Sequence, residues 1–198
     1  MSERARGRTD DDDAVPTATS GEPYRQGVNT GQQAVRYGRF LIVAALVLVV
    51  DQASKFWAVR ALADGRELTV LPPLIDFRLV YNSGAAFSIG KSVTWVFTLA
   101  AAAAVVGILY YGRRVTSTAW ALTLGAVLGG AVSHLGDRLF REPGFARGHV
   151  VDFIDYNGLF VGNVADIALV LGAVALAVLS WRGVPVRDVP ERDVPSPT

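Results

Sequence analysis

The sequence has no cysteine and only two histidines among its 198 residues. The lack of cysteine excludes disulfide bonds, thiolate metal sites and a cysteine nucleophile. With two histidines and no His-Glu-x-x-His motif, a zinc peptidase is not expected. Charged residues are also scarce, at 19%, and the net charge is only +1. Because no basic stripe is interleaved with aromatic residues, nothing in the composition indicates nucleic-acid binding.

Apolar residues are abundant instead, at 51% of the chain with a mean hydropathy of +0.33. They are concentrated in runs of about 20 residues, the length of a helix that crosses roughly 30 Å of hydrocarbon. The sequence therefore predicts an all-α integral membrane protein built on a four-transmembrane-helix bundle. The predicted spans are about residues 37–58, 93–111, 116–136 and 159–181.

The segment between the first two spans has a different pattern. Residues 62–90 contain short β-rich pieces separated by Pro72-Pro73 and Ser83-Gly84. This pattern predicts a small extracytoplasmic β-sheet platform between spans one and two.

The two ends of the chain are polar and low in complexity. Residues 1–34 and 183–198 are predicted to be disordered cytoplasmic tails that flank a membrane domain at 35–182. An alternative is a cleaved secretory signal peptide with the apolar core Phe40–Val50. The long preceding tail and the charges at Asp51 and Lys55 argue against that alternative.

Consecutive spans alternate in direction, so the end of the first, the end of the third and the start of the fourth lie on one side of the membrane. Polar residues at these ends are expected to converge there. They are Asp51, Asp137, Asn163 and Asp166. Arginines flank the opposite ends of the spans, which favours cytoplasmic termini and an extracytoplasmic polar cluster. They are Arg36, Arg39, Arg113, Arg114 and Arg182.

Asp166 lies within the last apolar run, where an ionised carboxylate costs roughly 3 kcal/mol or more. Two carboxylates that meet at a partly dry site share a proton, so one can act as base and the other as acid when water hydrolyses a peptide bond. Asp152, in the preceding loop, is the candidate partner. The alternative is that Asp166 makes a buried contact between helices and that Asp152 is an ordinary loop acid.

Neighbouring polar residues also have two interpretations. Asn163, three positions before Asp166, either orients that carboxylate or a substrate carbonyl, or caps the helix. Asp51 and Lys55 share one helical face and either form an ion pair that reaches the membrane interface or support the active site.

Asp137 and Arg138 are adjacent, so on a helix they point about 100° apart and do not pair with each other. Each is expected to tie the end of the third span to a loop or to the first span.

Five blocks of sequence resemble the lipoprotein signal peptidases, also called signal peptidase II, over about residues 37–182. They are Asp51-Gln52-Ala53-Ser54-Lys55, Asn82-Ser83-Gly84-Ala85-Ala86-Phe87, Gly129-Gly130-Ala131 through Asp137-Arg138, Val151-Asp152-Phe153, and Asn163-Val164-Ala165-Asp166. Any single block is a weak signal, whereas five in order over four spans are highly specific.

The resemblance implies an aspartic endopeptidase of the bacterial inner membrane, with Asp152 and Asp166 as the catalytic pair and Asn163 beside them. Its implied substrate is a diacylglyceryl-modified prolipoprotein, cleaved just before the lipidated cysteine, and it implies neither a metal nor an organic cofactor. The implied partners are these substrates and membrane lipids, and the expected state is a monomer. The implied fold has a small extracytoplasmic sheet that cradles the substrate and a short helix over the site.

Further residues are candidates for substrate binding or for support of the site. Four match positions with which the family holds the site together and engages substrate. They are Asp51, Asn82, Asp137 and Arg138. The candidate set is completed by Lys55, Gly84 and His134.

The chain departs from the family pattern at two places. Ser133-His134 stands where the family usually has Gly-Asn, and Gly162 replaces a phenylalanine before the last block. A neutral histidine supplies one donor and one acceptor, and its charge depends on pH. The departure predicts a shifted pH dependence or a reduced activity, while both acids are retained.

The alternatives to a peptidase are a transporter or proton-conducting bundle and a scaffold. A transporter or proton-conducting bundle would need polar residues through the whole membrane thickness, and the second span has none that are charged. In a scaffold, the acids would be purely structural, and an Asp166→Asn substitution would be tolerated.

Overall fold

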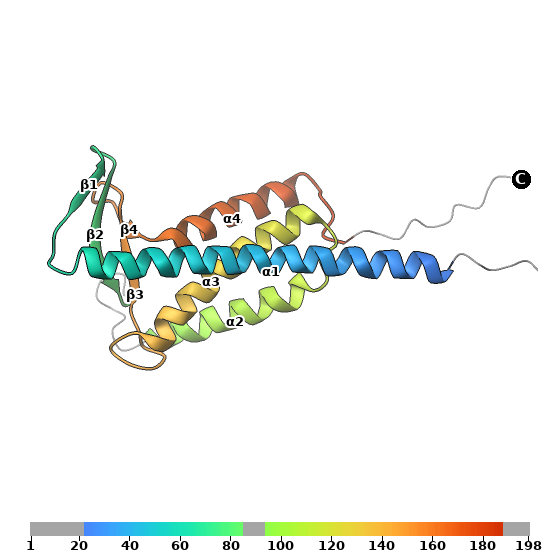
Figure 1. Ribbon diagram of the computed structural model, residues 1–198, viewed down its shortest axis with the longest axis horizontal. Helices are drawn as coiled ribbons and strands as arrows, with labels where there is room; N and C mark the ends of the chain where they lie inside the picture. The colour runs from blue at the N-terminus through green and yellow to red at the C-terminus, as the bar shows by residue number, and fades with distance from the viewer. Residues whose placement is uncertain (1–21, 85–93, 188–198) are drawn as a thin grey trace, which may run out of the picture.

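The computed structural model describes residues 22–84 and 94–187. In chain order its elements are α1 (Glu22–Ala61), β1 (Leu68–Leu71), β2 (Ile75–Asn82), α2 (Thr94–Gly112), α3 (Thr118–Phe140), β3 (Val150–Asp155), β4 (Val161–Gly162) and α4 (Val164–Trp181). The helices run alongside one another, with the sheet at one end of the bundle and the start of α1 and the end of α4 toward the other (Figure 1). Within the described ranges, four helices are long and apolar enough to cross a membrane.

Small residues of α3 set the close packing of the bundle. A Cβ atom at Gly125 would lie 2.5 Å from the backbone oxygen of Phe40, and one at Gly129 would lie 2.5 Å from that of Ala44. Helices surrounded by lipid associate through van der Waals contact, which small residues permit at short range. The two glycines therefore fix α3 against α1. Phe40 is fully buried in the resulting core.

The sheet has four antiparallel strands in the order β1-β2-β3-β4. The prediction of a sheet between spans one and two is therefore incomplete, because β3 and β4 come from the connection between α3 and α4. Residues assigned to the start of the fourth span form β4 because they pair with β3, which pairs in turn with β2. The register places Val80 opposite Asp152 and Asn82 opposite Val150.

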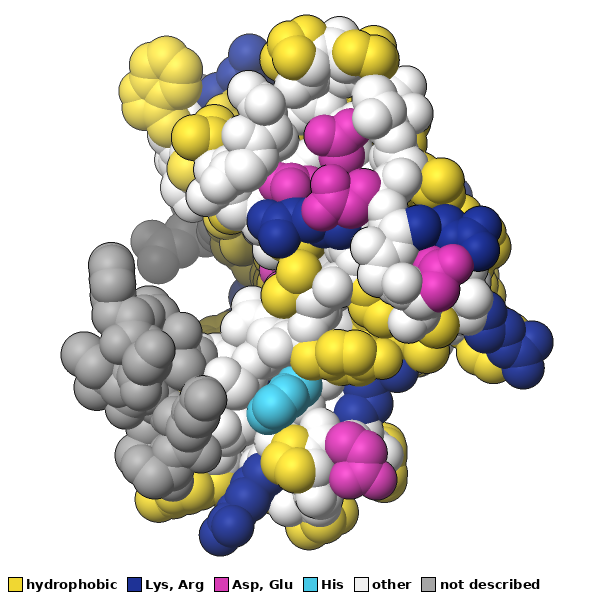
Figure 2. Space-filling view, turned by 90° about the vertical axis from the view of Figure 1, so that its left-hand side faces the viewer, with side chains coloured by type: hydrophobic (Ala, Val, Ile, Leu, Met, Phe, Trp, Pro, Cys, Tyr) yellow, Lys and Arg dark blue, Asp and Glu magenta, His cyan; other side chains and the backbone are white. Residues whose placement is uncertain are grey.

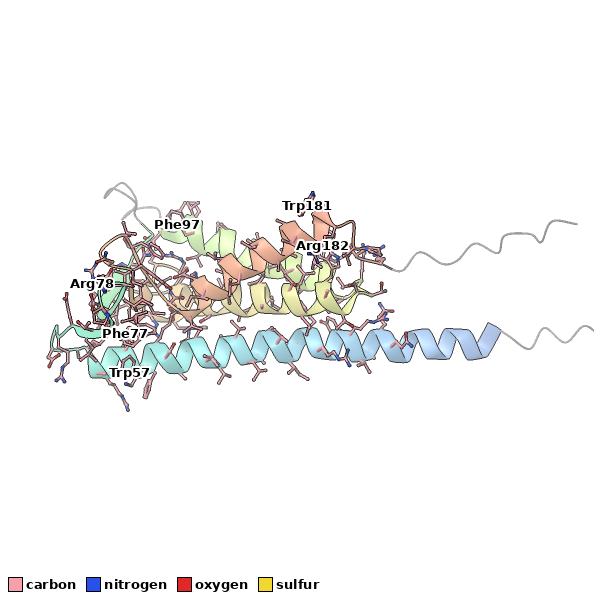
Figure 3. The ribbon with its side chains drawn as sticks, turned by 90° about the horizontal axis from the view of Figure 1, so that it is seen from above. Trp57, Phe77, Arg78, Phe97, Trp181 and Arg182 are labelled. Carbon is pink, nitrogen blue, oxygen red and sulfur yellow. The ribbon has the colours of Figure 1, made fainter. Side chains whose placement is uncertain are left out.

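An aromatic cluster joins the sheet to α1. The rings of Trp57, Phe77 and Phe153 meet edge to face, with centroids 5.6 to 6.2 Å apart. Such pairs add roughly 1 kcal/mol to the burial of their surfaces. The labelled Trp57 and Phe77 lie at the sheet end of the bundle, and Trp181 and Arg182 lie at the other end (Figure 3). The cluster thereby fixes β2 and β3 over the end of the bundle.

Two element boundaries differ from those predicted. The first helix begins at Glu22, so residues 22–34 are helical and not disordered. Pro23 is compatible with this start, because the first turn of a helix needs no backbone donor. The fourth helix begins at Val164, later than the predicted residue 159. Asp166 consequently lies in the first turn of α4, whereas the predicted start at residue 159 would put it about two turns into the span.

The chain that follows α4 is held against the start of α3. The backbone N–H of Thr116 donates to the oxygen of Val186 at 3.0 Å, and the indole N–H of Trp120 donates to the oxygen of Val184 at 2.9 Å. Residues 183–187 are thus ordered by these contacts, which corrects the prediction of disorder for that part. The remaining predicted tail segments, 1–21 and 188–198, lie outside the described residues.

Candidate active site

Asn163 is the N-cap of α4 and the central residue of the site. Its side-chain oxygen accepts from the backbone N–H of Asp166 at 3.0 Å, and the Asp166 carboxylate accepts from the backbone N–H of Asn163 at 2.9 Å. This reciprocal pair is a capping box, which satisfies two otherwise unpaired donors at the start of the helix. The capping interpretation of Asn163 is confirmed. Asn163 also fixes the orientation of the Asp166 carboxylate.

The same asparagine contacts the second candidate acid. Its side-chain nitrogen donates to Asp152 Oδ1 at 2.6 Å, and the nitrogen of Asn82 donates to Asp152 Oδ2 at 2.9 Å. Asp152 is 2% exposed, whereas the Asp166 side chain is 36% exposed. One asparagine therefore links two carboxyl groups that differ strongly in their access to solvent.

The electrostatic environment of Asp152 differs from that of its neighbour in the strand. Burial raises the pKa of the Asp152 carboxyl, and the charge of Asp166 adds to this against the lowering effect of the Asn82 and Asn163 hydrogen bonds. By contrast, the backbone N–H of Gly158 and the Arg78 side chain lower the pKa of Asp155. Asp152 is thus suited to hold a proton, and Asp155 is suited to remain ionised.

A turn after β2 positions Asn82. The Asn82 side-chain oxygen accepts from the backbone N–H of Gly84 at 2.8 Å, and Gly84 has a φ of +83°. A Cβ at Gly84 would lie 2.9 Å from the Phe97 ring and 3.0 Å from a guanidinium nitrogen of Arg138. Arg138 also donates to the backbone oxygen of Ser83 at 3.4 Å. The end of α3 therefore supports this turn; the next residues of the sequence block, Ala85-Ala86-Phe87, lie outside the described residues.

A buried ion network lies beneath the site. Lys55 Nζ is 2.6 Å from Asp51 Oδ2 and 2.8 Å from Asp137 Oδ2, and these three side chains are at most 1% exposed. The predicted ion pair between Asp51 and Lys55 is therefore present, but it is buried and does not extend to the surface as expected. The lysine is held inside the bundle because α3 brings a second carboxylate to it.

The network reaches both elements that carry the candidate acids. Asp51 Oδ1 accepts from the backbone N–H of Ala165 at 2.7 Å, in the first turn of α4. Asp137 Oδ2 accepts from the backbone N–H of Val151 at 3.3 Å, next to Asp152 in β3. Asp51 and Asp137 thus fix the backbone beside the two candidate acids, at Ala165 next to Asp166 and at Val151 next to Asp152.

Three further polar residues join the network without having been singled out as candidates. The Ser133 hydroxyl donates to Asp51 at 2.5 Å, Gln52 donates to Ser133 Oγ at 2.8 Å, and Arg141 donates to Asp137 at 2.6 Å. Arg141 is four positions after Asp137, so helical spacing was a usable signal. No local pattern pointed to the contact between Ser133 and Asp51, which joins α3 to α1.

The two departures from the family pattern both adjoin Asp166. His134 Nε2 lies 3.3 Å from Asp166 Oδ1 and 3.3 Å from Asn163 Oδ1. A Cβ at Gly162 would lie 3.0 Å from Asp166 Oδ2. The absence of a side chain at Gly162 therefore leaves one face of the carboxylate uncovered.

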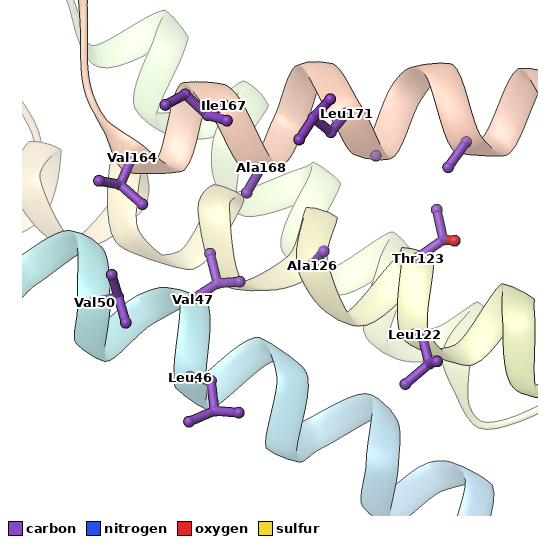
Figure 4. A pocket seen from close by; sticks show the side chains of 12 residues that line it. Leu46, Val47, Val50, Leu122, Thr123, Ala126, Val164, Ile167, Ala168 and Leu171 are labelled. Carbon is purple, nitrogen blue, oxygen red and sulfur yellow. The ribbon is translucent and has the colours of Figure 1, made fainter. Parts of the chain in front are cut away.

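An apolar groove begins beside the site and runs along the bundle. It has a volume of about 560 Å³ between α1, α3 and α4, and Figure 4 shows its lining side chains. Val164 and Ile167 line it on either side of Asp166 in the sequence. On the end face that carries the sheet, acidic and basic side chains gather together (Figure 2). In the described ranges, no group of three His, Cys, Asp or Glu side chains is arranged to hold a metal ion.

Known proteins share this fold. A solved chain described as a bacterial membrane enzyme structure, determined by the in meso method at 2.3 Å resolution, has a TM-score of 0.62 and 22% identity over 77% of this chain and 94% of its own. A second such structure, at 1.9 Å resolution, has a TM-score of 0.63 and 23% identity over 72% and 92% of the two chains. At these identities the likeness concerns the fold alone.

The sequence comparisons identify the family. The model of signal peptidase II matches residues 43–182. A lipoprotein signal peptidase of Mycolicibacterium smegmatis is 49% identical over 143 residues, which cover 72% of this chain and 61% of that relative. Another, of Rhodococcus jostii, is 39% identical over 180 residues, which cover 91% of this chain and 89% of that relative. The chain therefore belongs to the signal peptidase II family, a family of membrane peptidases.

Proposed function

We propose that this protein is an aspartic endopeptidase that removes the signal peptide from diacylglyceryl-modified bacterial prolipoproteins, cleaving just before the lipidated cysteine. The observation that carries the proposal is that Asn163 is hydrogen-bonded to both acids. Its side-chain nitrogen donates to the Asp152 carboxyl at 2.6 Å, and it forms the capping box with Asp166. Family membership and the retained sequence blocks support the same substrate class.

The two carboxyl groups divide the chemistry between them. An ionised carboxylate removes a proton from water as the oxygen attacks the scissile carbonyl, and the protonated partner gives its proton to the carbonyl oxygen. When the tetrahedral intermediate collapses, the C–N bond breaks and the departing amine receives a proton from the carboxyl that took one from water. As the C=O bond re-forms, the hydroxyl made from the carbonyl oxygen returns its proton to the other carboxylate. The dyad thus ends with one proton, as it began. Shared protonation is expected where two carboxyl groups meet and one is buried.

The environment of the site supports a substrate that is partly embedded in lipid. The apolar groove is lined by Val164 and Ile167, next to Asp166 in the first turn of α4 (Figure 4). An apolar segment of the signal peptide that occupied this groove would present its end to the more exposed carboxylate. The turn around Gly84 and Asn82 then contacts the part of the substrate outside the membrane.

The orientation in the membrane follows from the distribution of arginines. Arg182 lies at the end of the bundle opposite the sheet (Figure 3), and Arg113 and Arg114 connect α2 to α3 at that end. Cytoplasmic segments are enriched in Lys and Arg. We therefore place both termini in the cytoplasm and the acids near the extracytoplasmic face of the bacterial inner membrane.

A gel-shift cleavage assay tests the proposal. Purified wild type, Asp152→Asn and Asp166→Asn are incubated with a diacylglyceryl-modified prolipoprotein and with the same precursor lacking the lipid. We expect cleavage of the lipidated precursor alone, and a loss of at least about a hundredfold in both variants, because each lacks one proton-transfer group.

Asp155→Asn is the matched control. This acid is in the same strand as Asp152 but pairs with Arg78 at 2.5 Å, so cleavage is expected to continue. Retained cleavage in both dyad variants would contradict the proposed mechanism. No cleavage by folded wild type would instead favour a scaffold in which the acids are structural.

A further inference from the structure

His134 contacts both halves of the capping box, and the directions of the surrounding hydrogen bonds define its role. The Asn163 side-chain nitrogen donates to Asp152 Oδ1 at 2.6 Å, so the Asn163 oxygen is the atom that faces His134 Nε2 at 3.3 Å. That oxygen also accepts from the backbone N–H of Asp166. An amide oxygen only accepts, and therefore the atom facing it, His134 Nε2, must carry a proton.

The same Nε2 atom lies 3.3 Å from Asp166 Oδ1. A protonated Nε2 is a donor, and a carboxylate oxygen is its natural acceptor when the carboxyl group is ionised. A proton on Asp166 Oδ1 would instead face another N–H. The contacts from Asp152 through Asn163 to His134 therefore favour one arrangement of protons, in which His134 Nε2 carries a proton and Asp166 is ionised.

We infer that His134 is a positioning residue that keeps the proton of the dyad away from Asp166, which makes Asp166 the base and Asp152 the acid. The inference rests on the proposed function and adds to it the separate roles of the two acids. Burial agrees with this division, because Asp152 is 2% exposed whereas the Asp166 side chain is 36% exposed. The base is then the acid that water can reach.

Other charged groups near His134 are engaged elsewhere. On α3, Asp137 binds Lys55 of α1, and Arg138 lies over the Phe97 ring of α2 at 5.4 Å. Ser133, its neighbour in sequence, binds Asp51 of α1. Among the residues that the structure describes, Asp166 is the acid within 4 Å of the imidazole, and Asp152 lies behind Asn163.

The test compares His134→Gln with His134→Leu, measuring kcat and KM for the lipidated precursor at neutral pH. The glutamine amide keeps an N–H donor, so we expect His134→Gln to retain most of the wild-type kcat. The leucine variant has no donor, so kcat should fall about ten- to a hundredfold while KM changes less than about twofold.

His149→Gln is the matched control, because His149 is the other histidine of the chain and lies in the loop before β3. Its kcat and KM should match those of wild type. A second measurement needs no turnover: nitrogen NMR of ¹⁵N-histidine enzyme, assigned with the His149→Gln variant, should report His134 protonated at Nε2 at neutral pH.

The outcomes separate this inference from the proposed function. If the dyad variants lose cleavage but His134→Leu keeps the kcat of wild type, the role of His134 is overturned while the peptidase remains. A neutral His134 protonated at Nδ1 would also overturn it. If Asp152→Asn and Asp166→Asn both cleave, the proposed function itself fails. Should His134→Leu not fold, the glutamine variant and the NMR measurement still decide the matter.

Discussion

The carboxylate of Asp51 in α1 accepts a hydrogen bond of 2.7 Å from the backbone N–H of Ala165, 114 positions later in the chain. Ala165 belongs to the first turn of α4, where the backbone N–H groups have no partner within the helix. Asp51 thus holds the turn that carries Asp166. It is also one of the two acids that neutralise the buried Lys55.

Removal of Asp51 should therefore affect folding and catalysis together. In Asp51→Leu, Lys55 loses one of its two partners inside the bundle, and breaking a fully buried pair costs roughly 3 kcal/mol or more. We expect a lower thermal midpoint in detergent and a marked loss of cleavage. Asp64→Asn is the control, because its ion pair with Arg66 is more than half exposed and its loss should leave the midpoint nearly unchanged.

The double variant Asp51→Leu/Lys55→Met distinguishes charge from hydrogen bonding. Because it removes both members of one buried pair, it should recover part of the midpoint lost in the single variant. Cleavage should stay low, since Ala165 still lacks its acceptor. Equal midpoints for the single and double variants would show that the unpaired charge of Lys55 is not the main cause of the lowered midpoint.

The capping role of Asn163 predicts a stability effect as well as a catalytic one. Asn163→Ala removes the cap of α4 and a donor to Asp152, so the free energy of unfolding should fall by about 1 kcal/mol or more. The cleavage rate should fall by more than the decrease in folded protein accounts for, because both acids lose the hydrogen bonds that orient them. Thermal unfolding and cleavage rates on the same preparations measure the two effects.

Ser117→Ala provides the comparison. Ser117 is the N-cap of α3, and in the described structure its side chain makes no capping hydrogen bond. Its replacement should therefore leave both stability and cleavage close to wild type. An equal loss of stability in the two variants would mean that the Asn163 cap contributes nothing specific.

Gly84 is expected to be sensitive for two separable reasons. Its φ of +83° is strained for any residue with a side chain, and a Cβ would press against Phe97 and Arg138. Gly65 has a φ of +79° but nothing within 4 Å of its Cβ position. Gly84→Ala and Gly65→Ala should each destabilise by about 1 kcal/mol from backbone strain, but only Gly84→Ala should also reduce cleavage. Parallel unfolding and cleavage assays on the two variants provide the test.

The raised pKa of Asp152 predicts how stability depends on pH. Because burial raises this pKa above its value in the unfolded chain, the folded protein binds more protons than the unfolded chain at pH values between the two pKa values. The contribution of Asp152 to stability is present below about pH 4 and is lost as pH rises through the folded pKa. Wild type should therefore lose stability relative to Asp152→Asn with increasing pH, as followed by thermal midpoints across the interval.

Asp155→Asn should behave in the opposite sense. The hydrogen bond from Gly158 and the Arg78 side chain lower the pKa of Asp155, so its contribution is present above the unfolded pKa and is lost as pH falls through the folded pKa. Wild type should therefore gain stability relative to Asp155→Asn as pH rises. Parallel pH dependence in the two variants would show that the environments of Asp152 and Asp155 do not differ as described.

Much of the architecture could be predicted because its signals are local. The lengths of the apolar runs indicated four spans, and the alternation of their directions brought Asp51, Asp137 and Asp166 to one end. The small residues Gly125 and Gly129 of the third span approach α1 closely. The predicted sheet lacked β3 and β4, which come from the connection between α3 and α4. A two-residue strand such as β4, at the start of an apolar run, is indistinguishable from the first turn of a helix.

The sequence by itself determined which residue types were present and which end of the bundle they would reach, since run length and spacing follow from covalent order. The tertiary structure alone decided their protonation and their partners. Asp152 and Asp155 are three residues apart in one strand, yet burial raises the pKa of one and hydrogen bonds lower that of the other. Likewise, the burial of Lys55 and the contact of His134 with Asp166 depend on the positions of helices that are distant in sequence. A carboxyl group responds to the charges and the solvent within a few ångströms, and those are set by packing between elements.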